Sequence, residues 1–207
     1  EMVAAGVREL VALPLYPHYS IATTGSSFAD LQRTMARLRL DLPVREIRDW
    51  PAAPDYIACL AARIEEGLAG FDGEPVDLLY SAHSLPVQFI TEGDPYALHL
   101  QQTIRAVEAV TGKQGRLCYQ SRSGPVEWLG PSTPEVIRET AARGGKNLLV
   151  VPLSFVSDHV ETLYEIDIEY RQMAEELGLR FAATRALNDD PQFIAALRRL
   201  VLDACAG

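Results

Sequence analysis

Residues 147–169 read NLLVVPLSFVSDHVETLYEIDIE. A nearly continuous apolar run of strand length, residues 147–155, leads here into a polar cluster and then into a helical pattern. Continuous apolar runs are typical of strands whose two faces are both covered, as in a parallel sheet. This stretch therefore predicts one strand of a parallel sheet, followed by a helix that packs on the sheet.

The same alternation of strand and helix extends along the rest of the chain. Further strand-like runs occupy residues 9–15, 44–47, 76–81, 115–119 and 179–183, and helical stretches occupy residues 26–39, 53–68, 94–111, 133–143, 158–177 and 190–204. The pattern predicts an α/β fold, a Rossmann-like parallel sheet in three layers. We expect residues 1–186 to form one α/β domain without an internal break, and residues 187–207 to form an appended terminal helix.

Composition excludes several classes of protein. The 207 residues are 48% hydrophobic and 23% charged, which is typical of globular domains. With 19 basic and 28 acidic residues the net charge is −9, which disfavours a nucleic-acid partner. Cys59, Cys118 and Cys205 form no paired motif, which favours a reducing compartment and a cytoplasmic location. No apolar run reaches the roughly 18 residues that a membrane-spanning helix requires.

A histidine lies where a second buried strand ends. Residues 78–86 read LLYSAHSLP, which places His83 at the carboxyl end of the strand, before a proline. In parallel α/β sheets that edge binds ligands. Two interpretations remain open at this point: a histidine that merely hydrogen-bonds a neighbouring turn, or one that ligates a metal or accepts a proton near pH 7.

The helix after residue 155 carries a line of acidic residues. Glu161, Glu165 and Glu169 recur four residues apart, and in a regular α-helix they drift by about 40° per step, whereas a π-bulge would bring them closer into line. A solvated acidic face is the alternative. Asp158 and Glu161 lie at the start of the predicted helix beside His159, where carboxylates can meet His83. This arrangement suits a loosely held divalent metal or proton abstraction.

A third candidate region is the loop at residues 119–132, which is rich in proline and glycine. Arg122 can bind a ligand carboxylate through two hydrogen bonds. Trp128 offers an aromatic platform, although a tryptophan in such a place is more often part of the core.

At these places the chain resembles ferrochelatases. The resemblance rests on LPLYPHYS (13–20) with TTGSS (23–27), YSAHSLP (80–86), QSRSGPVEWLGPST (120–133) and VVPLSFVSDHVETLYEIDIEY (150–170), in the order of the family. It implies a metal chelatase, a lyase of haem and porphyrin biosynthesis that inserts Fe²⁺ into protoporphyrin IX or coproporphyrin III. The family's site histidine and glutamate fall on His83 and Glu161, as catalytic and metal-binding residues. The acidic relay falls on Glu165 and Glu169, and the substrate cleft on Ser121, Arg122, Trp128, Asp158 and His159.

The resemblance also implies partners that lie outside this chain. Ferrochelatases have two α/β domains, and the chain looks like the second domain with the C-terminal helix that packs on the first. We expect the missing N-terminal domain, a porphyrin and a divalent metal as partners. No cofactor is required, Fe²⁺ being a substrate, and the ungrouped cysteines predict no iron–sulfur cluster. A silent fragment that binds metal or porphyrin, a chelatase for another metal or tetrapyrrole, and a peripheral membrane contact all remain open.

Overall fold

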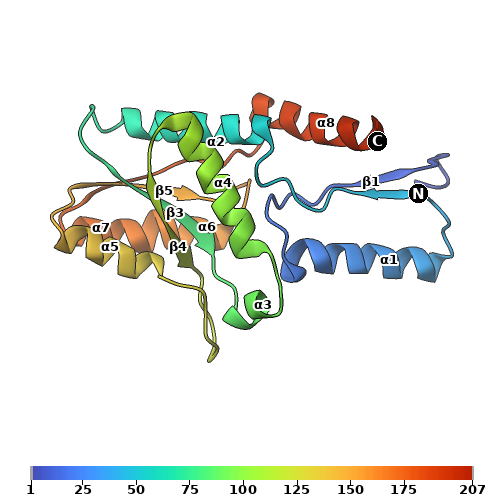
Figure 1. The fold of residues 1–207 in the computed structure, drawn as a ribbon, viewed down its shortest axis with the longest axis horizontal. Coiled ribbons are helices and arrows are strands. Elements are labelled where there is room, and N and C mark those ends of the chain that lie inside the picture. The colour runs from blue at the N-terminus through green and yellow to red at the C-terminus, as the bar shows by residue number, and fades with distance from the viewer. Residues whose placement is uncertain (1, 207) are drawn as a thin grey trace.

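A parallel sheet in the order β4-β3-β5-β6 forms the centre of the larger lobe in a computed structural model that describes residues 2–206 (Figure 1). Its strands are β3 (Asp77–His83), β4 (Gly115–Gln120), β5 (Asn147–Pro152) and β6 (Arg180–Ala183). All three neighbouring pairs are parallel, which confirms the predicted α/β class.

Helices cover both faces of this sheet. Helices α2 (Pro54–Ala69) and α4 (Tyr96–Thr111) lie on one face, and α5 (Thr133–Ala142) and α7 (Arg171–Glu176) lie on the other (Figure 1). In β5 the side chains of Leu149 and Val151 join the core under α2 and α4, whereas those of Leu148 and Val150 join the core under α5 and α7. Because successive residues point to opposite covered faces, residues 148–151 of the strand are all apolar.

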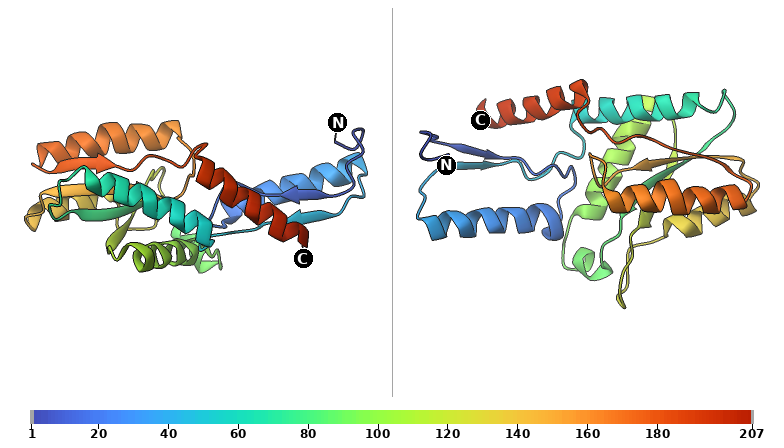
Figure 2. Two further views of the ribbon diagram at one scale, coloured as in Figure 1. Left: turned by 90° about the horizontal axis from the view of Figure 1, so that it is seen from above. Right: turned by 180° about the vertical axis from the view of Figure 1, so that it is seen from behind.

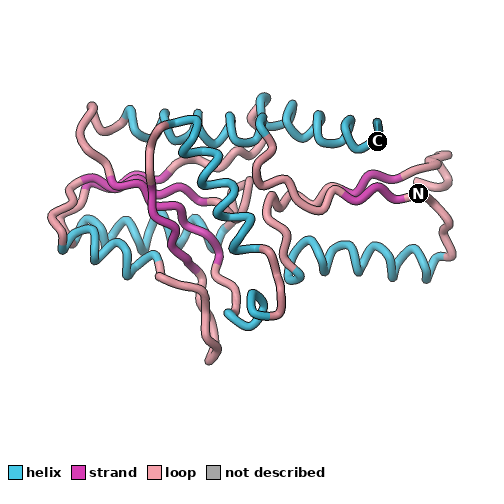
Figure 3. Tube along the Cα trace, in the orientation of Figure 1, coloured by secondary structure: helices cyan, strands magenta, loops and turns pink. Residues whose placement is uncertain are grey.

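The first two strands form a separate sheet, which corrects the expectation that the strand-like runs join one parallel sheet. Strands β1 (Leu10–Ala12) and β2 (Val44–Glu46) pair in parallel with each other, and α1 (Ser26–Leu38) runs beside them in a smaller lobe (Figures 2 and 3). Pro14 and Pro17 follow β1, and proline cannot donate to a ladder, so β1 ends after a few residues. Apolar runs do not reveal which sheet a strand joins.

The terminal helix α8 (Pro191–Ala206) bridges the two lobes. It contacts both α2 and β1, and its buried Phe193 lies 6.1 Å from the Trp50 ring, centroid to centroid. The partly buried Leu197 and Leu200 pack against the same core. The division of the chain after residue 186 stays a prediction.

Two short helices lie outside the sequence prediction. Residues 21–25 form the π-helix η1 (Ile21–Gly25) ahead of α1, and α3 (Val87–Thr91) follows the histidine-bearing loop. Ser20 begins η1, since its Oγ accepts the backbone N–H of Ala22 over 3.1 Å. Both helices are shorter than the periodicity of side chains can reveal.

The loop between β1 and η1 carries a buried histidine. His18 is 2% exposed, and its Nε2 lies 2.8 Å from Thr103 Oγ1. Because Thr103 donates its own hydrogen to the Pro51 carbonyl, His18 Nε2 is the donor in this pair. Its Nδ1 has no hydrogen-bond partner among residues 2–206. Burial, with a smaller effect of His99, lowers the pKa of His18 to about 3.

The lowered pKa of His18 predicts that acid destabilises the folded chain. Between pH 6.5 and 3 the unfolded chain binds a proton at residue 18 that the folded chain does not, so the free energy of unfolding falls as the pH falls. The slope from this group approaches about 1.4 kcal/mol per pH unit. Denaturant titrations from pH 7 to 4 measure it. His18→Gln removes this part of the slope and the exposed His159→Gln keeps it, whereas equal slopes in all three proteins would contradict the assignment.

Candidate active site

The parallel pairing of β3 and β5 brings the carboxyl ends of these two strands to one edge of the larger sheet. These strands are neighbours, yet the chain leaves β3 toward α4 on one face and leaves β5 toward the acidic helix on the other. Such a reversal opens a crevice at the carboxyl ends of the strands, where α/β proteins bind their ligands. His83 is the last residue of β3, and residues 153–159 follow β5 at the same edge.

The ring of His83 presents its Nε2 atom to Glu161. Its Nδ1 lies 2.9 Å from the Ser84 carbonyl oxygen, which only accepts, so Nδ1 carries the ring proton. Nε2 then keeps its lone pair and lies 3.7 Å from Glu161 Oε2. The side chains are 29% and 51% exposed, which leaves the pair open to a ligand. A lone pair and a carboxylate at this separation suit a shared proton or a bridging metal ion.

The acidic helix contains the π segment that the alignment of its glutamates requires. Helix α6 (Val160–Leu163) passes into the π-helix η2 (Tyr164–Tyr170) and then into α7. The wider π turn offsets the drift of residues spaced four apart. Glu161 lies next to His83, Glu165 contacts Ser121, and Glu169 lines a groove with Arg138. The three carboxylates therefore run from the crevice to an outer groove.

Within the line of three glutamates, Glu165 has a raised pKa. Burial raises the pKa of this carboxyl, and the charge of Glu161 raises it further. Ser121 opposes the shift, since its backbone N–H donates to Glu165 Oε1 over 3.1 Å and its hydroxyl donates to Oε2. A carboxyl with a raised pKa keeps a proton more readily than an ordinary glutamate does.

The loop at residues 121–132 lies against the segment that follows His83. The Ser84 hydroxyl donates to the Leu129 carbonyl over 3.1 Å, and Pro86 forms a β-bridge with Trp128. Arg122 donates within its own loop, to the Leu129 carbonyl over 2.8 Å. Ser121 therefore holds Glu165, and Arg122 holds its own loop. Trp128 is partly exposed. Their roles in a substrate cleft stay predictions.

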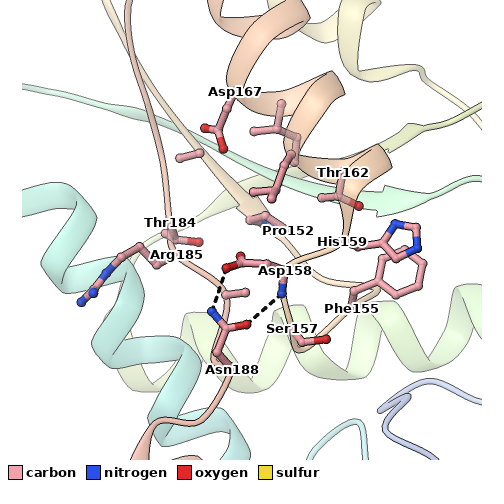
Figure 4. A pocket seen from close by; sticks show the side chains of 14 residues that line it. Pro152, Phe155, Ser157, Asp158, His159, Thr162, Asp167, Thr184, Arg185 and Asn188 are labelled. Atoms are coloured by element: carbon pink, nitrogen blue, oxygen red, sulfur yellow. Dashed lines mark hydrogen bonds between the residues drawn. The ribbon is translucent and has the colours of Figure 1, made fainter.

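Asp158 and His159 lie on different sides of the segment that enters α6. Asp158 is tied to Asn188: its N–H donates to Asn188 Oδ1 over 2.8 Å, and Asn188 Nδ2 donates back over 3.0 Å (Figure 4). The His159 ring stacks on Phe155, with centroids 4.7 Å apart, and Phe155 in turn presents itself edge-on to His83. Asp158, His159 and Phe155 line a pocket of about 270 Å³ that does not include His83. Their cleft roles also stay predictions.

Sequence reasoning missed the buried polar residues that support Glu161. Ser81 Oγ donates to Gln120 Oε1 over 2.6 Å, and Gln120 Nε2 lies 3.4 Å from Thr162 Oγ1 on the acidic helix. Gln120 is 3% exposed, so this pair fixes the helix next to Glu161 from inside the protein. The feature of the sequence that could have revealed this pair is Gln120 itself, a glutamine at the end of a largely buried strand. That strand lies next to the strand that ends in His83.

Residues 2–206 contain no cluster of three or more histidine, cysteine or acidic side chains suited to a metal ion, so His83 and Glu161 are a two-residue set. Two protein ligands leave the remaining coordination positions of an ion to other molecules. Cys59 and Cys118 are buried and Cys205 is exposed. No helix in the described part of the chain is long and apolar enough to cross a membrane.

Comparison with solved structures identifies the fold. The structure of SirB from Bacillus subtilis with Fe³⁺ matches with a TM-score of 0.73 at 12% identity, over 98% of this chain and 74% of that one. The sirohydrochlorin chelatase SirB in complex with cobalt matches with a TM-score of 0.67 at 11% identity. At such identities the likeness concerns the fold alone, and the fold is that of the chelatases.

Sequence comparison then gives the family. The ferrochelatase profile matches residues 1–205. The ferrochelatases of Desulfotalea psychrophila and Geotalea uraniireducens are 57% and 51% identical over 203 and 199 residues, or 98% and 95% of this chain. The chain belongs to the ferrochelatase family. It spans 63% and 62% of the length of these two relatives.

Proposed function

We propose that the protein to which this chain belongs inserts Fe²⁺ into a porphyrin in haem biosynthesis, and that His83 and Glu161 handle the metal and the protons. The observation that carries the proposal is the lone pair of His83 Nε2 facing Glu161 Oε2 over 3.7 Å at the carboxyl edge of the sheet. Membership of the ferrochelatase family supports it independently. We further propose a cytoplasmic location.

The chemistry requires that two protons leave as one metal ion enters. A free-base porphyrin carries two pyrrole N–H groups, and Fe²⁺ replaces both protons, so the charge of the macrocycle is unchanged. We assign His83 Nε2 as the atom that accepts a pyrrole proton, since Nδ1 is already protonated. Glu161 faces the same atom and stabilises the resulting imidazolium, or binds the incoming ion with it.

The remaining glutamates supply a route for charge. Glu165 has a raised pKa and lies between Glu161 and the outer groove, so it is suited to take a proton on and pass it outward. Glu169 lines that groove beside Arg138, where solvent receives the proton or supplies the ion. We propose no cofactor beyond the substrates, and both protoporphyrin and coproporphyrin as candidate porphyrins.

A second candidate is a chain that binds metal or porphyrin without turnover. What favours it is that the chain spans only 63% of the Desulfotalea relative. We propose that the share of the relatives outside the match forms the N-terminal domain and completes the porphyrin cleft. A chimaera that joins this chain to that share of the Desulfotalea ferrochelatase tests the point.

We expect the chimaera to insert Zn²⁺, an air-stable substitute for Fe²⁺, into protoporphyrin or coproporphyrin, and the chain alone to insert it far more slowly. In the chimaera, the two domains enclose the porphyrin from both sides and position the macrocycle over His83. Such positioning contributes several kcal/mol to catalysis. Porphyrin absorbance and fluorescence follow the reaction. An active chain alone would show that this part holds the whole chemistry, and silence in both proteins, with the intact Desulfotalea enzyme active, would contradict the proposed function.

A further inference from the structure

The backbone of His83 is held by a closed ring of hydrogen bonds. Its N–H donates to Ser154 Oγ over 2.6 Å, and its carbonyl oxygen accepts the hydroxyl of Tyr96 over 2.9 Å. Tyr96 and Ser154 also contact each other over 2.7 Å. Because Tyr96 has already used its one hydrogen, Ser154 is the donor in this third contact. Every donor in the ring has one acceptor.

The ring joins three elements that are far apart in sequence. His83 ends β3, Ser154 follows β5, and Tyr96 is the first residue of α4. Tyr96 is 6% exposed, so its hydroxyl does not exchange its partners for water at low cost. A strand end held by both its N–H and its carbonyl has little freedom to turn.

The first turn of α4 is itself rigidly held. Asp94 Oδ1 accepts the N–H of Tyr96 over 3.0 Å, and Asp94 Oδ2 accepts the hydroxyl of Ser20 over 2.9 Å and the N–H of Ile21 over 2.8 Å. One turn later, His99 Nδ1 accepts the N–H of Tyr19 over 3.1 Å. Tyr96 therefore stands on a turn that also anchors the loop leading out of the smaller lobe.

We infer that Tyr96 and Ser154 are positioning residues that fix the direction of His83 Nε2 toward Glu161. The effect of these two residues on metal insertion rests on the proposed function, whereas the orientation that they give to the His83 ring does not. With both backbone groups of residue 83 fixed and Nδ1 bonded to the Ser84 carbonyl, the ring plane has one orientation, and in it Nε2 faces the carboxylate. Neither residue touches the ion or the porphyrin in this scheme.

Tyr96→Phe and Ser154→Ala test the inference, and Tyr80→Phe is the matched control. Tyr80 lies on the same strand as His83 and is fully buried, but its hydroxyl has no hydrogen-bond partner within residues 2–206. The readouts are the ¹⁵N and ¹H signals of the His83 ring without metal and the affinity of the chain for Zn²⁺. Loss of supporting hydrogen bonds at metal ligands typically costs about 10- to 100-fold in affinity.

We expect each ring variant to shift the Nδ1–H signal of His83 and to weaken Zn²⁺ binding about 10-fold. The effects of the two substitutions are not additive, because Tyr96 and Ser154 also contact each other. In the chimaera kcat falls while the KM for porphyrin stays, and Tyr80→Phe changes none of these. Unmoved His83 signals in Tyr96→Phe would overturn the inference. If the wild-type chain binds no Zn²⁺, the proposed metal-holding role of His83 and Glu161 fails, while the metal-free signals still decide the positioning role.

Discussion

Replacing His83 with alanine in the chimaera is expected to lower kcat for Zn²⁺ insertion by about 10²- to 10⁴-fold, the range typical of a lost general base. The substitution removes Nε2, the atom that keeps a free lone pair opposite Glu161. Because the site is 29% exposed at the histidine and half exposed at the glutamate, a small molecule can enter the space left by the ring. Stopped-flow porphyrin fluorescence under single turnover measures the rate.

Added imidazole provides the control for this variant. If the loss reflects the missing nitrogen and not a damaged fold, millimolar imidazole restores part of the rate in His83→Ala and leaves the wild-type rate unchanged. Thermal unfolding of the variant checks that the sheet edge is intact. A wild-type rate in His83→Ala without imidazole would exclude the histidine as proton acceptor or metal ligand.

Phe193→Ala is expected to destabilise the chain by about 3–5 kcal/mol, the range for a large aromatic side chain removed from a core. Phe193 is 1% exposed and joins α8 to Trp50 and to the core that α2 and α4 share. Its loss leaves a cavity at the point where the terminal helix meets both lobes. Urea titrations followed by circular dichroism measure the free energy of unfolding.

The neighbouring Ile194→Ala is the matched control, because this side chain lies on the same helix and is 49% exposed. We expect its free energy of unfolding to remain within about 0.5 kcal/mol of that of the wild type. Equal effects of the two substitutions would mean that α8 is not anchored through Phe193.

The sequence predicted the parts of the site that follow from strand ends and helix spacing. His83 was found because a buried strand leads directly into it, and parallel strands bring their carboxyl ends to one edge. The line of Glu161, Glu165 and Glu169 was found from its spacing, and the π segment that brings such residues into line is present. The two-sided burial of β5 was predictable for the same kind of local reason.

Other features depend on where distant segments meet, which no local pattern contains. Ser121 reaches Glu165 from a left-handed backbone conformation, at φ 62°, across 44 residues of sequence. Asp158 is bonded to Asn188, 30 residues away, although its position beside the helix start suggested a meeting with His83. The ring of Tyr96 and Ser154 around His83 likewise joins a helix start to a strand end. Pairing of β1 and β2 in their own sheet was hidden because an apolar strand does not specify its neighbour.

The central claim is that His83 and Glu161 together hold the metal ion, and an NMR titration of the ¹⁵N-labelled chain with Zn²⁺ tests it most directly. We predict that Zn²⁺ shifts the Nε2 signal of His83 while Nδ1 keeps its proton, because Nδ1 is bonded to the Ser84 carbonyl. Glu161→Gln should weaken this binding by about 10-fold or more, and Glu169→Gln should leave it nearly unchanged. Zn²⁺ that shifts another histidine, or that leaves His83 Nε2 unmoved, would contradict the account.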